Sequence, residues 1–91
     1  MDIHVSLKGR GDLAARIYRQ LVAAILDGSL RRGERLPPSR ELARRLSVSR
    51  NTVATAYERL VAEGFLEGRV GDGTFVNANV RTAASERRAR K

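Results

Sequence analysis

The chain has 91 residues, with 18 lysines and arginines against 10 aspartates and glutamates, and its formal net charge is +8. This length allows one small domain with a modest core, which excludes an enzyme with a deep pocket. The chain has no cysteine, so disulfides and cysteine-based metal sites are excluded as well. The excess of cations favours an anionic partner, most commonly nucleic acid.

The positive charge is distributed unevenly. Residues 78–91 hold five cationic residues and one acidic residue, which is half of the net charge. Almost all the cations are arginines, whose planar groups form paired hydrogen bonds to phosphate and guanine; codon usage in a GC-rich genome explains this preference equally well. No apolar run approaches the roughly 18 residues that cross a bilayer, and the N-terminus lacks a signal-peptide pattern. We therefore expect a cytoplasmic, nucleoid-associated protein without membrane contact.

The N-terminal part predicts an extended arm followed by a helix. Residues 3–7 alternate between apolar and polar side chains, which is typical of a short strand or arm, and Gly9 and Gly11 end it. Asp12 is placed to cap a helix, and Gly28 is placed to end it, because glycine readily adopts the left-handed conformation. An apolar stripe recurs between them at helical spacing: Leu13, Ile17, Leu21, Ala24 and Ile25.

A second, shorter helix follows a basic connector over residues 29–35. Pro37 and Pro38 keep the chain extended, and Ser39 is expected to cap the helix. Its apolar residues are Leu42, Ala43 and Leu46. Ser47 begins the turn that ends this helix.

A third helix is predicted from the cap Ser49 to about Glu63, where Gly64 stops it. Its apolar stripe consists of Val53, Ala56, Tyr57, Leu60 and Val61. Two short helices joined by a tight turn have the geometry of a helix-turn-helix motif.

Two strands are predicted after the third helix, over residues 65–67 and 74–76. Residues 68–73 between them are rich in glycine and predict a hairpin loop, the wing. Residues 78–91 read as a basic, flexible linker. The predicted fold is mainly α: a winged helix-turn-helix of three helices and a two-stranded antiparallel wing over residues 1–77.

The outer face of the third helix is the main candidate for binding. With Val53 facing inward, Asn51 and Thr55 point away from the core, Thr52 lies to one side, and Ser49 and Arg50 stand at the tip. A recognition helix enters the major groove of DNA with its N-terminus first. Asparagine suits adenine and arginine suits guanine or phosphate. A capped, solvated helix face explains the same pattern about as well.

Further candidates lie outside that helix. Arg40, at the start of the second helix, is expected to contact phosphate. In the wing, Gly71 allows a close backbone approach, and Arg69 is expected to reach phosphate or the minor groove. His4 is the sole histidine and no carboxylates cluster around it, so we predict no metal site, no nucleophile–base pair and no catalytic residue.

Several linked motifs between residues 33 and 76 resemble the GntR family of regulators. They are Gly33-Glu34-Arg35-Leu36-Pro37-Pro38-Ser39-Arg40-Glu41-Leu42-Ala43, Val48-Ser49-Arg50-Asn51-Thr52-Val53, Ala56-Tyr57-Glu58-Arg59-Leu60, Glu63-Gly64-Phe65-Leu66 and Gly71-Asp72-Gly73-Thr74-Phe75-Val76. The resemblance extends over about residues 11–77. It implies a bacterial transcription regulator that binds double-stranded operator DNA in a sequence-specific way.

Within that family, the patterns look most like the MocR subfamily, and the YtrA-like subfamily is the main alternative. MocR-like regulators join such a domain to an aminotransferase-like domain that binds pyridoxal phosphate. The resemblance therefore implies that this chain is an N-terminal piece without its own cofactor, and that the full-length protein can form a homodimer.

The family's DNA contacts match Arg40, the polar tip at Arg50, Asn51 and Thr52, and the wing glycine Gly71. Two positions depart from the pattern of some members: Ala54 stands where an arginine occurs, and Val70 stands where a basic residue or histidine occurs. These departures leave the operator sequence open. A winged helix used for protein–protein contact is the remaining alternative, and it would favour an exposed apolar patch.

Overall fold

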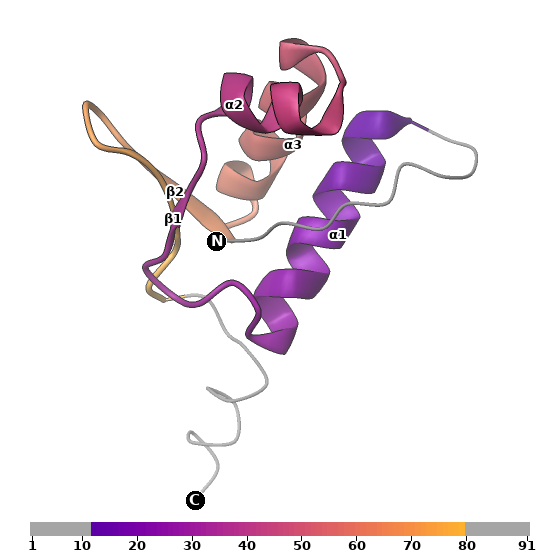
Figure 1. The fold of residues 1–91 in the computed structure, drawn as a ribbon. Coiled ribbons are helices and arrows are strands. Elements are labelled where there is room, and N and C mark those ends of the chain that lie inside the picture. The colour runs from indigo at the N-terminus through magenta and orange to yellow at the C-terminus, as the bar shows by residue number, and fades with distance from the viewer. Residues whose placement is uncertain (1–11, 80–91) are drawn as a thin grey trace, which may run out of the picture.

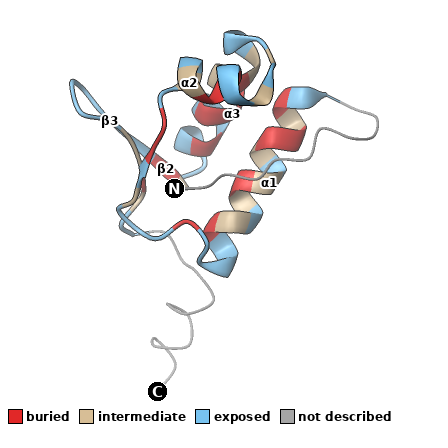
Figure 2. Ribbon diagram, viewed as in Figure 1, coloured by how far each residue is buried: buried red, intermediate tan, exposed pale blue. Residues whose placement is uncertain are grey.

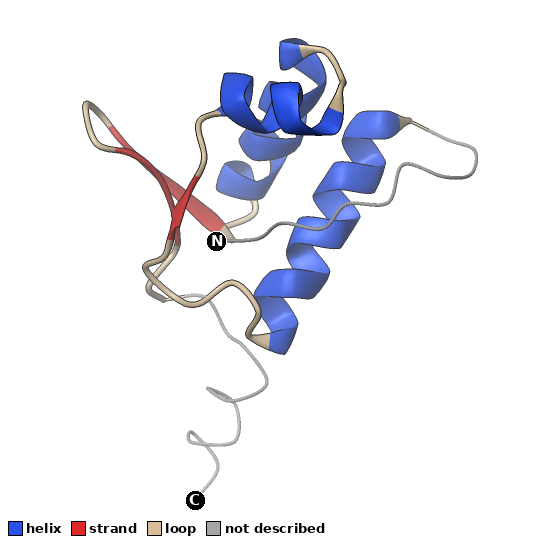
Figure 3. Ribbon diagram, viewed as in Figure 1, coloured by secondary structure: helices blue, strands red, loops and turns tan. Residues whose placement is uncertain are grey.

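The computed structural model describes residues 12–79, and the predicted arm at residues 3–7 and nearly all of the 78–91 tail lie outside this range. In chain order the elements are α1 (Leu13–Asp27), β1 (Arg35–Leu36), α2 (Ser39–Leu46), α3 (Arg50–Ala62), β2 (Leu66–Arg69) and β3 (Gly73–Val76) (Figures 1 and 3). Three helices followed by an antiparallel hairpin confirm the predicted winged helix-turn-helix fold.

Helix α1 begins and ends as the sequence predicts. The side chain of Asp12 accepts a hydrogen bond from the backbone N–H of Ala14 at 2.9 Å, which satisfies one of the free donors of the first turn. At the other end, Gly28 has a φ of 89° and donates its N–H to the carbonyl of Ile25. Both ends are therefore set by single local residues.

The start of α2 differs from the prediction that Ser39 caps it. Ser39 is the first helical residue, Pro38 occupies the cap position, and no side chain caps the helix. The carbonyl of Pro38 accepts hydrogen bonds from Glu41 and Leu42, at 2.9 and 3.0 Å. Proline suits this position because its extended backbone leads into the helix and its missing N–H leaves no donor unsatisfied.

The turn between α2 and α3 is tight. Ser47 adopts the left-handed conformation with a φ of 57°, and the N–H of Val48 returns to the carbonyl of Ala43 at 3.0 Å. The hydroxyl of Ser49 then accepts the N–H of Thr52 at 3.1 Å, which confirms Ser49 as the cap of α3. The helix-turn-helix geometry is thus fixed by two serines with different roles.

The sheet has three strands rather than the two that the sequence predicts. Their order is β1-β3-β2, all antiparallel, with Arg35 opposite Phe75 and Leu66 opposite Val76. A strand of two residues before a proline has no periodicity to reveal it, and it forms because β3 supplies its partner. The predicted hairpin strands are also longer than expected, so the loop between β2 and β3 shrinks to residues 70–72.

A single core lies where α1, α3 and the sheet face one another, as the buried residues in Figure 2 show. Its fully buried side chains include Ile17, Leu21, Ile25, Leu36, Leu42, Val53, Leu60, Leu66 and Val76. The placement of Val61 in the buried stripe of α3 is wrong, because its side chain is 43% exposed on the flank of the helix. Within residues 12–79, no helix is long and apolar enough to cross a membrane.

Candidate nucleic-acid interface

The outer face of α3 carries the polar residues that the sequence singled out. Asn51 and Thr55 are exposed, whereas Val53 and Leu60 on the opposite side are completely buried. Neither Asn51 nor Thr55 forms a side-chain hydrogen bond with another described residue. Their amide and hydroxyl groups are therefore available to an external partner, as the helical periodicity predicted.

The tip of α3 divides into structural and available groups. The Ser49 hydroxyl accepts the Thr52 N–H and also lies 2.7 Å from the Thr52 hydroxyl, so both side chains are engaged with each other. Arg50 is exposed and takes no part in an ion pair with any of the described residues. Of the three predicted contacts at this tip, Arg50 has the freest side chain.

Two arginines of α2 differ in the same way. Arg45 forms an ion pair with Glu41 at 3.3 Å, one helical turn earlier. Arg40 is exposed and has no ion-pair partner among residues 12–79. Only Arg40 offers an uncompensated charge at the beginning of α2, near the segment that enters the helix from the sheet.

The wing presents its predicted residues unequally. Gly71 lies in the loop with a φ of 84°, and the N–H of Asp72 closes the turn on the carbonyl of Arg69 at 2.9 Å. The guanidinium of Arg69 is 3.2 Å from a carboxylate oxygen of Glu67 and stacks over the ring of Phe75, 4.3 Å from its centre. Val70 is fully exposed at the tip. Arg69 is thus held against the sheet surface.

A shallow groove of about 400 Å³ runs between α3 and the wing. It is lined by Ser39, Ala54, Tyr57, Glu58, Val61, Ala62 and Thr74. The exposed flank of Val61 belongs to this groove, which explains why that side chain does not join the core. Glu58 is the one acidic residue in the lining and gives the groove a negative charge.

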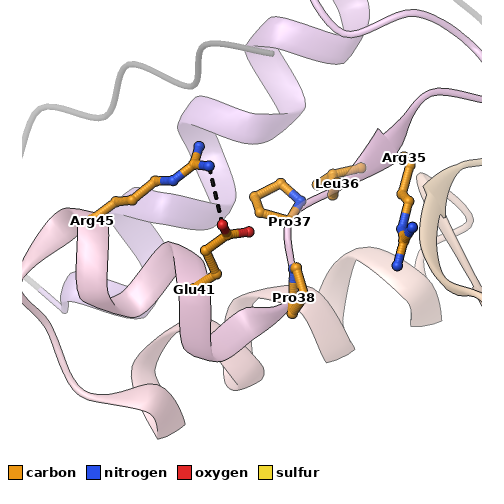
Figure 4. Close-up of a pocket in the computed structure, with 6 residues that line it drawn as sticks. All are labelled: Arg35, Leu36, Pro37, Pro38, Glu41 and Arg45. Atoms are coloured by element: carbon orange, nitrogen blue, oxygen red, sulfur yellow. Dashed lines mark hydrogen bonds and ion pairs between the residues drawn. The ribbon is translucent and has the colours of Figure 1, made fainter.

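A second hollow of about 360 Å³ lies between β1 and α2 (Figure 4). Its lining consists of Arg35, Leu36, Pro37, Pro38, Glu41 and Arg45. Sequence reasoning did not single out Arg35, because the strand that carries it was not recognised. The one available signal was a cationic residue directly before the apolar Leu36 and the two prolines.

A polar cluster joins α1 to the C-terminal end of α3. The Tyr18 hydroxyl donates a hydrogen bond to Glu63, and the Arg59 guanidinium lies 3.9 Å from the centre of the Tyr18 ring. Arg59 also pairs with Glu63 at 3.5 Å. The hydrogen bond to Glu63 raises the pKa of the Tyr18 hydroxyl above its usual value. This cluster fixes the end of α3 that lies away from the polar tip.

The described residues carry eleven arginines and eight acidic residues. Three of the arginines, Arg45, Arg59 and Arg69, are neutralised by neighbouring carboxylates. Within residues 12–79, no three histidine, aspartate or glutamate side chains come together as metal ligands do. The chemistry available at this surface is therefore hydrogen bonding and charge rather than metal binding.

Comparison with known proteins gives one family. The model described as "Bacterial regulatory proteins, gntR family" matches residues 13–76. The probable rhizopine catabolism regulatory protein MocR of Rhizobium meliloti is 54% identical over 61 residues, which is 67% of this chain and 12% of that protein. This similarity confirms the expected resemblance to MocR-like regulators, and the chain spans only about an eighth of that relative's length.

Two solved structures share the fold. YtrA from Sulfolobus acidocaldarius, a GntR-family transcription factor, has a TM-score of 0.75 and 31% identity, over 96% of this chain and 89% of that one. The AraR DNA-binding domain in complex with operator ORX1 has a TM-score of 0.72 and 27% identity, over 84% of this chain and 98% of that one.

Proposed function

Because this chain belongs to the GntR family of bacterial regulatory proteins, we propose that it binds double-stranded operator DNA in a sequence-specific way and thereby controls transcription. In this proposal α3 enters the major groove with its N-terminus first, and the wing lies on the backbone or in the minor groove. The AraR domain, of the same fold, was solved bound to an operator, which supports this use of the surface.

The observation that carries the proposal is the state of the side chains on the outer face of α3. Arg50, Asn51 and Thr55 are exposed and unpaired among the described residues, whereas most other polar groups nearby are engaged with one another. Arginine and asparagine are the side chains best suited to guanine and adenine edges. The partial positive charge at the start of α3 also attracts phosphate.

The groove between α3 and the wing has a shape that suits one strand of the DNA backbone. Ser39 and Thr74 stand on its two sides, and the uncapped beginning of α2 opens beside it. Arg40, close to that beginning, is our choice for a phosphate contact, as the sequence predicted. We assign Ser49 and Thr52 a mainly structural part, since their hydroxyls already bond to each other.

The alternative of a protein-interaction module has less support. The large apolar side chains that are exposed in the described part of the chain are Leu13, Leu26, Val61 and Val70. They lie at the two ends of α1, on α3 and at the wing tip, so they do not form one continuous patch of the kind that marks a protein interface.

Partners of the longer protein are a separate proposal. This chain spans 12% of the length of MocR, so a domain outside these residues would supply the response to a small molecule. We propose that pyridoxal phosphate, expected from the MocR resemblance, belongs to such a domain, and that dimerisation there joins two copies on paired half-sites. DNA binding by residues 12–79 should then be unaffected by added pyridoxal phosphate.

The test begins with selection of bound duplexes from a random library, because the operator is not needed in advance. Fluorescence anisotropy then compares the selected duplex with a scrambled one at two salt concentrations. Wild type should prefer the selected duplex at both concentrations. Arg50→Ala should lose about 1–3 kcal/mol on the selected duplex and much less on the scrambled one.

Arg32→Ala is the matched control, because Arg32 is equally exposed but lies in the loop after α1, at the opposite end of the molecule from α2 (Figure 1). It should leave the preference unchanged. Equal losses on both duplexes for Arg50→Ala, or selection that enriches no sequence, would count against sequence reading by α3.

A further inference from the structure

Arg35 of β1 reaches across the sheet to the base of the wing. It pairs with Phe75 in the register of β1 and β3, and its guanidinium lies over Gly73, two residues nearer the wing tip. A β-carbon at position 73 would lie 3.1 Å from Nε and 3.4 Å from Nη2 of Arg35. Gly73 also has a φ of 117°, so two features of the structure favour glycine under this side chain.

The wing itself has no cation to spare. Between residues 66 and 76 the sole basic residue is Arg69, and the acidic residues are Glu67 and Asp72. Arg69 is paired with Glu67 at 3.2 Å and stacked on Phe75. The hairpin therefore has a net negative charge, and phosphate beside it would be repelled unless another element supplied a positive charge.

Arg35 supplies that charge. It is exposed, and it has no ion-pair partner among the described residues. Figure 4 shows Arg35 and Arg45 on opposite sides of the hollow beside Pro37 and Pro38, with Arg45 turned to Glu41. Of the two guanidinium groups around this hollow, only that of Arg35 remains uncompensated.

We propose that Arg35 binds a phosphate of the DNA strand that passes between the beginning of α2 and the wing, and that Gly73 is required to let its guanidinium lie there. The contact is made to the backbone, so it positions the wing on DNA without reading sequence. This inference rests on the proposed DNA binding. It moves the cation of the wing from Arg69, the residue expected from the sequence, to Arg35 of β1.

The experiment measures the affinity of the folded chain for the selected and the scrambled duplex over a series of salt concentrations. Arg35→Ala should weaken binding to both duplexes by the same factor, roughly two- to fivefold at low salt. The slope of log affinity against log salt should fall by about one, as expected for the loss of one phosphate contact. Arg35→Lys should restore the slope in part, because the charge returns without the planar group.

Arg45→Ala and Arg69→Ala are the matched controls, since both arginines are already paired with carboxylates. Each should change the salt slope much less than Arg35→Ala does. Gly73→Ala should weaken binding in wild type more than in the Arg35→Ala background, because its effect on Arg35 is then absent. Circular dichroism and thermal melts establish that every variant is folded.

The outcomes separate this inference from the proposed function. A wild-type chain that prefers its selected duplex, together with an Arg35→Ala variant of unchanged affinity and slope, would overturn the role of Arg35 and leave DNA binding intact. A larger loss of slope in Arg69→Ala than in Arg35→Ala would return the contact to Arg69. A wild-type chain that binds no duplex would overturn both proposals.

Discussion

The hydroxyl group of Tyr57 donates a 2.7 Å hydrogen bond to the backbone carbonyl of Pro37, and both groups are buried. This bond ties the middle of α3 to the extended segment that leads from β1 into α2. It therefore fixes the recognition helix relative to the sheet and to the beginning of α2 at once. Twenty residues separate the partners in sequence.

Removal of the Tyr57 hydroxyl should destabilise the fold. Tyr57→Phe keeps the packed ring but leaves the buried Pro37 carbonyl without its partner, which costs about 1–3 kcal/mol. Urea unfolding followed by circular dichroism measures this loss. Tyr18→Phe is the control, because the Tyr18 hydroxyl bonds to Glu63 at the surface, and it should cost less. Equal stability of Tyr57→Phe and wild type would show that the hydrogen bond contributes nothing.

Stability should also fall in alkaline solution. Burial raises the pKa of the Tyr57 hydroxyl well above its ordinary value near 10, so the unfolded chain releases this proton at a lower pH than the folded protein does. The contribution is complete below about pH 10 and is lost as the pH rises beyond it. Urea midpoints between pH 8 and pH 11 measure the decline. It should be shallower in Tyr57→Phe, and a decline of wild-type slope in that variant would contradict the assignment.

The cap of α3 permits a test that separates stability from binding. Ser49→Ala loses the hydrogen bond to the Thr52 N–H and should cost about 1 kcal/mol. Ser49→Asp keeps a capping oxygen and adds a favourable charge at the beginning of the helix, so it should fold as well as wild type. Its carboxylate would face phosphate, however, and should weaken DNA binding.

Thermal melts and anisotropy titrations of the two Ser49 variants give both quantities. If Ser49→Asp binds DNA as tightly as wild type, the beginning of α3 does not approach phosphate, and the proposed orientation of the helix is wrong.

The groove between α3 and the wing should bind DNA more tightly without its carboxylate. Glu58→Gln removes the acidic group from the groove lining and should raise affinity for both duplexes roughly two- to fivefold, most clearly at low salt. The control is Glu34→Gln, which lies in the loop after α1, where its side-chain oxygen accepts the Arg31 N–H. An unchanged or lower affinity for Glu58→Gln would place the DNA backbone outside this groove.

The sequence by itself determined the helices, their ends and the polar face of α3. Asp12, Gly28 and Ser49 act within one turn of the chain, and each has the structural role that its residue type predicts. The linked motifs between residues 33 and 76 also gave the family, which the match over residues 13–76 confirms. These features were predictable because capping and helical periodicity are local properties of a chain.

Only the tertiary structure decided which charged and polar groups remain available. The strand β1 exists because β3 pairs with it, and Arg35 reaches the wing only through that pairing. Arg69 is held by Glu67 and Phe75, while the exposed flank of Val61 borders the groove. Contacts between strands and across the sheet join residues far apart in sequence, and neither periodicity nor residue type reveals them.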